Sequence, residues 1–95
     1  MNLYEVIRRP ILTEKNTRLM ERHNQYTFEV ARKANKAQIQ EAIEVAFGVR
    51  VLNVRTSIVP GKPRRRGRTV GGSKPWKKAV VTLAPGDRID IFQGI

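Results

Sequence analysis

The pattern of apolar and polar positions divides the chain into short strands and amphipathic helices. Residues 25–30 alternate strictly, with Tyr26, Phe28 and Val30 on one face and polar side chains on the other. A period of two predicts a half-buried strand. Its aromatic side chains are expected to pack in a core, and the alternative is that Tyr26 and Phe28 stack on bases, as aromatic residues do on some RNA-binding sheets.

The clearest helix signal follows that strand. Asn35 and, three residues later, Gln38 have the spacing of a capping box, and Gly48 supplies a left-handed stop. Apolar residues recur between them at helical spacing, namely Ile39, Ala42, Ile43, Ala46 and Phe47. The pattern therefore predicts a helix over residues 35–47, with its solvent face formed by Gln38, Gln40, Glu41 and Glu44.

Two further strands are predicted in the second half of the chain. Residues 49–59 read as a long strand whose apolar face carries Leu52, Val54, Thr56 and Ile58. Val49 and Val51 fall on the opposite parity, which indicates a bulge or a second buried face. Residues 79–83 alternate again, Pro85-Gly86 forms a turn, and the chain closes against the core through Ile89, Ile91 and Phe92.

The N-terminal part carries weaker signals. Residues 1–9 fit either a short edge strand or a helical turn, which Pro10 ends. Thr13 is placed to cap a helix that runs to about Arg22, with Leu12, Leu19 and Met20 as its sparse apolar contacts. His23, the only histidine, is expected at a surface turn.

These elements predict an α+β fold in one domain that covers residues 1–95. The sheet is small and mostly antiparallel, and the helices pack on it. The helix between the strands at 25–30 and 49–59 gives a βαβ-like unit, and the strands at 49–59 and 79–83 form an antiparallel hairpin around a long insertion.

That insertion, residues 60–78, is the most basic part of the chain and is called the arm. It contains four glycines, three prolines, no acid and eight cations: Lys62, Arg64, Arg65, Arg66, Arg68, Lys74, Lys77 and Lys78. The chain as a whole has a net charge of +11, from 19 bases and 8 acids, so removing the arm would leave the charge almost balanced. Such a concentrated basic segment indicates a polyanionic partner, and its arginines favour nucleic acid.

Several function classes lack support. The chain has no cysteine, which excludes disulfides and thiolate metal sites and fits a cytosolic protein. It has neither a signal-peptide pattern nor an apolar run long enough to span a bilayer, so no membrane insertion is expected. No phosphate-cradling glycine motif is present, and the eight acids are scattered. We therefore expect no catalytic residues, no metal, no cofactor and no enzyme activity.

Six segments, in this order, resemble one known family. They are Pro10-Ile-Leu-Thr-Glu-Lys15, Tyr26-Thr-Phe-Glu-Val30, Lys33-Ala-Asn-Lys36, Val59-Pro-Gly-Lys62, Arg66-Gly-Arg68 and Trp76-Lys-Lys-Ala-Val-Val-Thr-Leu83. Together they cover most of the chain and are similar to the bacterial large-subunit ribosomal protein twenty-three (the uL23 family). One departure is Gly71-Gly72-Ser73, where many relatives have more basic residues.

The resemblance implies a structural protein of the large ribosomal subunit in the cytoplasm, bound to 23S rRNA near the exit of the polypeptide tunnel. It implies neighbouring ribosomal proteins, trigger factor and the signal recognition particle as partners, contact with the nascent chain, and no homo-oligomer. The segment that matches the family's docking site for trigger factor is Leu12, Thr13 and Glu14. The expected rRNA-binding residues are Arg8, Arg9, Arg32, Lys33, Lys36, Trp76 and the eight cations of the arm.

Some alternatives remain open at the level of the sequence. Arg32, Lys33 and Lys36 either contact phosphates at a helix start or are ordinary solvated charges. Trp76 either stacks on a base or covers the base of the hairpin. A free-standing RNA- or DNA-binding module is the second interpretation of the whole chain, and a small enzyme on a ferredoxin-like scaffold is the third.

Overall fold

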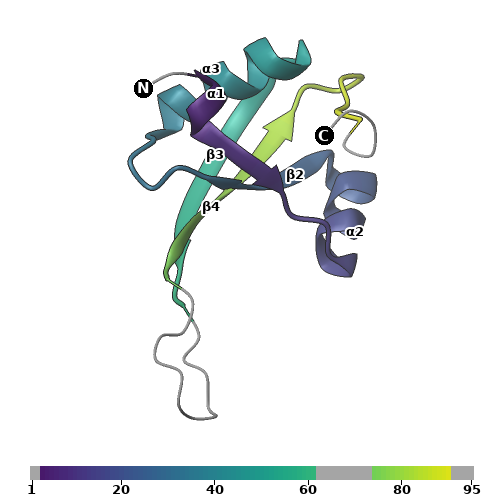
Figure 1. Ribbon diagram of the computed structural model, residues 1–95. Helices are drawn as coiled ribbons and strands as arrows, with labels where there is room; N and C mark the ends of the chain where they lie inside the picture. The colour runs from purple at the N-terminus through teal and green to yellow at the C-terminus, as the bar shows by residue number, and fades with distance from the viewer. Residues whose placement is uncertain (1–2, 62–73, 91–95) are drawn as a thin grey trace.

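The computed structural model describes residues 3–61 and 74–90. Three helices and four strands follow one another along the chain (Figure 1). They are α1 (Leu3–Val6), β1 (Ile7–Pro10), α2 (Glu14–His23), β2 (Gln25–Val30), α3 (Lys36–Phe47), β3 (Val51–Val59) and β4 (Trp76–Leu83). The first nine residues thus include both a helical turn and an edge strand, and β1 ends at Pro10 as predicted.

The four strands form one sheet in the order β1-β2-β4-β3, and every neighbouring pair is antiparallel. Since β2 and β3 both run antiparallel to β4, they are parallel to each other and are linked through α3. The predicted βαβ-like unit is therefore present, with β4 inserted between its strands. The predicted α+β fold class is confirmed.

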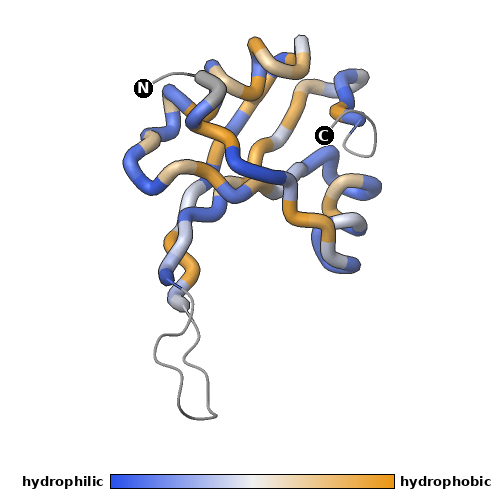
Figure 2. Tube along the Cα trace, viewed as in Figure 1, coloured by the Kyte–Doolittle hydropathy of each residue, from blue (hydrophilic) through white to orange (hydrophobic). Residues whose placement is uncertain are grey.

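The core lies between the sheet and α3. The helix contributes Ile39, Ala42 and Ile43, all at most 1 % exposed, and the two central strands contribute Tyr26, Phe28, Val30, Ala79, Val81 and Leu83. Burying an aliphatic or aromatic side chain of this size stabilises a fold by about 1.5–3 kcal/mol. Figure 2 shows hydrophobic positions on these strands and on α3, whereas only the first part of β1 is hydrophobic and its middle is hydrophilic.

Both long helices begin and end as the sequence predicts. The Oδ1 of Asn35 accepts from the backbone N–H of Gln38 at 2.8 Å, and the Oε1 of Gln38 accepts from the N–H of Asn35 at 3.0 Å. Thr13 caps α2 by accepting from the N–H of Asn16. Gly48 ends α3 with a φ of 65°, a left-handed conformation that glycine adopts without steric cost.

The strand before the arm differs from its prediction. It begins at Val51 rather than Val49, and its pairing with β4 is irregular between Val51 and Asn53. The predicted bulge is thus present, but it moves Leu52 out of the core, so that Leu52 is 59 % exposed. Ile58 is 50 % exposed because it pairs with Lys77, near the end of the hairpin, where little of the core remains.

Three smaller expectations are also wrong. Leu12 precedes α2 and is 48 % exposed, so it is no core contact of that helix. Ala46 is exposed, although it lies in the last turn of α3 beside Phe47, which packs against the core. Thr27 was assigned to a polar face, yet it is buried and its hydroxyl has no hydrogen-bond partner among the described residues.

The end of the sheet opposite the arm is held by side-chain bonds to backbone. Asn24 ends α2 in the left-handed region, with a φ of 53°, and its Nδ2 donates to the carbonyls of Leu83, Ala84 and Asp87. The hydroxyl of Tyr26 accepts from the N–H of Ile89, which is buried as predicted. Ile91 and Phe92 lie outside the described residues.

Candidate nucleic-acid interface

The base of the arm is a regular hairpin. Strands β3 and β4 pair from Val51 and Leu83 to Val59 and Trp76, and this paired ribbon extends away from the helices (Figure 1). We call the end of the sheet where Val59 pairs with Trp76 the arm end. Five of the predicted rRNA-binding residues lie outside the described part of the chain: Lys62, Arg64, Arg65, Arg66 and Arg68.

The four predicted residues at the C-terminal side of the arm have different environments. Lys74 is exposed, and Trp76 is half-buried at the first position of β4. The Nζ of Lys77 donates to the carbonyl of Ala34 at 2.5 Å, so this lysine ties β4 to the loop between β2 and α3. Lys78 lies on the other face of the sheet, where it pairs with Glu29 of β2 and Ser57 of β3.

Strand β1 supplies two arginines with different partners. The Nε of Arg9 lies 2.7 Å from the Oε1 of Glu29, and the Glu29 side chain is only 19 % exposed. Arg8 is exposed and lines two neighbouring hollows. Arg9 is thus partly committed to the sheet, whereas Arg8 is available to a ligand.

These two hollows bring together predicted residues from three segments. One, of about 440 Å³, is lined by Glu5, Arg8, Ala31, Arg32 and Lys33. The other, of about 350 Å³, lies toward the arm and is lined by Arg8, Glu29, Val30, Arg32 and residues 74–77. Arg8 and Arg32 belong to both. The fold therefore unites the arginines of β1 and of the β2–α3 loop with the base of the arm.

Most cations at this end have no acidic partner. Across residues 3–61 and 74–90 the ion pairs are Arg9–Glu29 and Arg18–Glu14. Six further bases here, exposed or half-buried, pair with no described carboxylate: Arg8, Arg32, Lys33, Lys74, Lys77 and Lys78. Lys36 is exposed at the first position of α3 and adds to this charge, although the Asn35 cap already occupies one N–H of that helix start. Unpaired cations gathered at one end form a surface that attracts phosphate.

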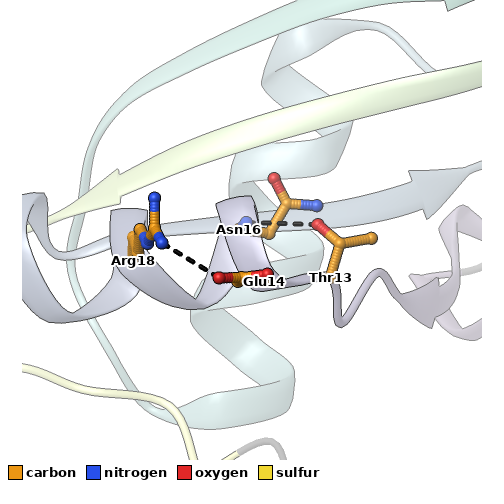
Figure 3. A network of polar contacts seen from close by, with 4 residues as sticks. All are labelled: Thr13, Glu14, Asn16 and Arg18. Carbon is orange, nitrogen blue, oxygen red and sulfur yellow. Dashed lines mark hydrogen bonds and ion pairs between the residues drawn. The ribbon is translucent and has the colours of Figure 1, made fainter.

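A second predicted site lies at the start of α2. Leu12, Thr13 and Glu14 are all exposed, and Thr13 accepts from the N–H of Asn16. The Oε1 of Glu14 accepts from the Nη2 of Arg18, one turn along the helix, at 2.9 Å (Figure 3). Arg18 is not among the residues predicted for this site, although the i, i+4 spacing of an acid and an arginine is a recognisable helix pair.

Neither metal binding nor membrane insertion finds support in the described residues. They contain no group of three or more acidic or histidine side chains placed to hold a metal ion. None of the helices described is long and apolar enough to cross a bilayer.

Comparison with known proteins identifies the family. The family model for ribosomal protein L23 matches residues 5–91. The large ribosomal subunit protein uL23 of Desulfatibacillum aliphaticivorans is 60 % identical over 95 residues, which is the full length of both chains. The uL23 proteins of Roseiflexus sp. (strain RS-1) and Anaeromyxobacter sp. (strain K) are 60 % and 51 % identical, each over 99 % of both chains.

These relatives are named as ribosomal proteins rather than as enzymes, which confirms the prediction of a non-enzymatic protein. The match extends over both candidate sites and the strands that position them. The chain belongs to the ribosomal protein L23 family.

Proposed function

We propose that this protein is a structural component of the large ribosomal subunit in the cytoplasm and that it binds 23S rRNA through the arm end of its sheet. The observation that carries the proposal is the gathering of Arg8, Arg32, Lys33 and Lys74 without acidic partners beside the base of the arm. Phosphate contacts of this kind fix the position and orientation of a protein on RNA.

The arm itself supplies the remaining charge. Its arginines, and its lysines other than Lys77, bind the rRNA backbone, and the paired strands β3 and β4 lead directly into this basic segment. The family resemblance supports a position for this contact near the exit of the polypeptide tunnel, beside neighbouring large-subunit proteins and within reach of the nascent chain.

The second site is proposed to recruit factors that act on emerging chains. Leu12, Thr13 and Glu14 form an exposed apolar and acidic patch on a different element from the RNA-binding cations. The carboxylate of Glu14 accepts a hydrogen bond from Arg18 within the same helix, and a basic side chain of a partner would compete with Arg18 for it. We assign trigger factor and the signal recognition particle as the partners of this patch.

Sedimentation of the protein with ribosomes tests the first assignment. The chain is expected to migrate with the large subunit at high salt, whereas a free-standing RNA-binding module or a small enzyme would remain at the top of the gradient.

Replacing Arg64, Arg65, Arg66 and Arg68 with alanine should weaken binding to 23S rRNA and flatten its salt dependence. The matched control replaces four bases distant from the arm: Lys15, Arg22, Arg50 and Arg88. Equal affinity and salt slope in the two variants would refute the role of the arm.

Glu14→Ala tests the second assignment. This variant should bind 23S rRNA normally but should lower the affinity of ribosomes for trigger factor. Glu21→Ala, which removes an exposed carboxylate from the same helix, is the control. If Glu14→Ala ribosomes bind trigger factor as well as the control, Glu14 is not the docking residue.

A further inference from the structure

The hollow of about 350 Å³ at the arm end combines an aromatic wall with unpaired cations. It opens where β2 stops between its two neighbours. Val30, the last residue of β2, pairs with Ile7 on one side and Lys77 on the other, while β4 continues to Trp76, which pairs with Val59. The chain then leaves the sheet at Ala31, so a gap remains at the end of β2.

The walls of this gap differ in chemistry. Pro75 and Trp76 form an apolar side, while Arg8, Arg32 and Lys74 provide positive charge. Glu29 is the only carboxylate among the lining residues, and Arg9 binds one of its oxygens. Lys77 fixes the wall formed by the start of β4, because its ammonium group is bonded to the carbonyl of Ala34 on the opposite loop.

We propose that this hollow holds one unpaired nucleotide of the bound RNA, with the base stacked on Trp76 and its phosphates on Arg8 and Arg32. The inference rests on the proposed binding of rRNA and specifies the form of RNA that is recognised. The volume lies within the range of small-ligand pockets, about 300–1,000 Å³. A base inside a duplex is stacked on both faces and cannot offer one to a side chain, whereas bases in loops and bulges are splayed out onto aromatic residues.

The carboxylate of Glu29 supports this orientation of the nucleotide. A phosphate placed beside it would be repelled, so the phosphates lie toward Arg8 and Arg32 and the base toward Glu29 and Trp76. A hollow that recognised only phosphates would not need an aromatic wall or include an acid. The combination of stacking surface and cations is instead that of single-stranded RNA sites.

The protein contains a single tryptophan, so its fluorescence reports on the site directly. Titration of the full-length chain with a short single-stranded oligoadenylate should quench the emission of Trp76, because the base stacks on the indole. An RNA duplex with the same total number of phosphates should bind through the arm with much less quenching. Equal quenching by the two RNAs would overturn the proposal.

Two variants separate stacking from folding and charge. Trp76→Leu should weaken binding of labelled oligoadenylate by about tenfold, in keeping with the contribution of one stacked base, and should leave duplex binding unchanged. Trp76→Phe, which retains an aromatic face, should recover most of the loss, and Arg88→Ala is the control for a distant exposed cation. If Trp76→Leu weakens both RNAs equally or neither, the hollow does not hold a base.

The experiments give different results if the nucleotide site is wrong and if the proposed function is wrong. If 23S rRNA binding and large-subunit sedimentation persist in the native chain but no quenching by oligoadenylate occurs, the nucleotide site is refuted and the rRNA role stands. If the native chain does not migrate with the large subunit at all, the proposed function is refuted first, and the site in the hollow loses its basis with it.

Discussion

The two ends of the sheet use polar side chains in opposite ways. At the end where β2 begins, Asn24 donates to three carbonyls, Asp87 accepts from the N–H of Arg50 at 2.8 Å, and Tyr26 accepts from the N–H of Ile89. At the arm end, Arg8 and Arg32 line open hollows and pair with no described carboxylate. The polar groups at the end where β2 begins therefore stabilise the fold, whereas the cations at the arm end remain available to a ligand.

Because of this difference, effects of a substitution on the stability of the fold can be measured separately from effects on RNA binding. A side chain bonded to buried backbone costs stability when it is removed, because its partners lose their hydrogen bonds. An exposed cation contributes little to stability, since even paired surface charges are worth about 0–1 kcal/mol. Substitutions at the two ends should therefore affect different measurements.

The largest expected effect on stability is that of Asn24→Ala. The change removes the Nδ2 amide, whose two N–H groups are shared among three carbonyls and contribute about 0.5–1.5 kcal/mol each. It also places alanine at a φ of 53°, which costs about 1–2 kcal/mol. The free energy of unfolding, measured with urea, should therefore fall by about 2–5 kcal/mol. Asn24→Gly loses the same donors without the strain and should be less destabilised. If the two variants are equally stable, the left-handed backbone is not a source of strain at this position.

The matching change at the arm end is Arg8→Ala combined with Arg32→Ala. RNA affinity should fall by about tenfold, and the salt dependence of binding to single-stranded RNA should flatten by about 0.7 units of slope for each lost phosphate contact. The free energy of unfolding should change by less than about 0.5 kcal/mol. The control, Arg22→Ala with Arg88→Ala, removes two exposed bases from the opposite end and should leave the RNA affinity nearly unchanged. An equal loss in both double variants would mean that binding depends on net charge alone.

Neighbouring lysines of β4 sharpen the comparison within a single strand. Lys77 was predicted to bind RNA, yet its Nζ is bonded to the carbonyl of Ala34, whereas Lys78 lies on the other face of the sheet. Lys77→Met should lower the free energy of unfolding by about 1 kcal/mol and leave the salt slope of RNA binding almost unchanged. Lys78→Met should do the reverse. Identical behaviour of the two variants would remove the distinction between a structural and a binding lysine.

Local signals made most of the fold predictable from the sequence. The capping box of Asn35 and Gln38 and the alternation of Tyr26, Phe28 and Val30 act within a few residues, and the structure confirms both. The errors arise where long-range geometry decides. Leu52 has the parity of a core residue, but the bulge beside it turns its side chain outward.

The candidate site was only partly predictable for the same reason. Charge and family resemblance identified Arg8, Arg32 and Trp76 individually. Their meeting in one hollow depends on the sheet order and on the point where β2 ends, which the sequence does not state. The structural role of Asn24 could not be predicted from the sequence, where it is only a polar residue after a helix. Its three acceptors lie about sixty positions later in the chain.

The smallest expected effect on stability is at the patch formed by Leu12, Thr13 and Glu14 at the start of α2, which belongs to neither of the two ends of the sheet. Arg18 binds Glu14 on a solvent-exposed helix face, and such a pair contributes about 0.3–0.5 kcal/mol, so Arg18→Ala should leave the free energy of unfolding nearly unchanged. The same change frees the carboxylate that a basic group of trigger factor would bind. Ribosomes with Arg18→Ala should therefore bind trigger factor at least as tightly as native ribosomes, in contrast to Glu14→Ala. Arg22→Ala, which removes a base that does not pair with Glu14, is the control. A clear loss of trigger factor binding in Arg18→Ala would mean that Arg18 contacts the partner itself, and the acidic group alone would no longer define the docking surface.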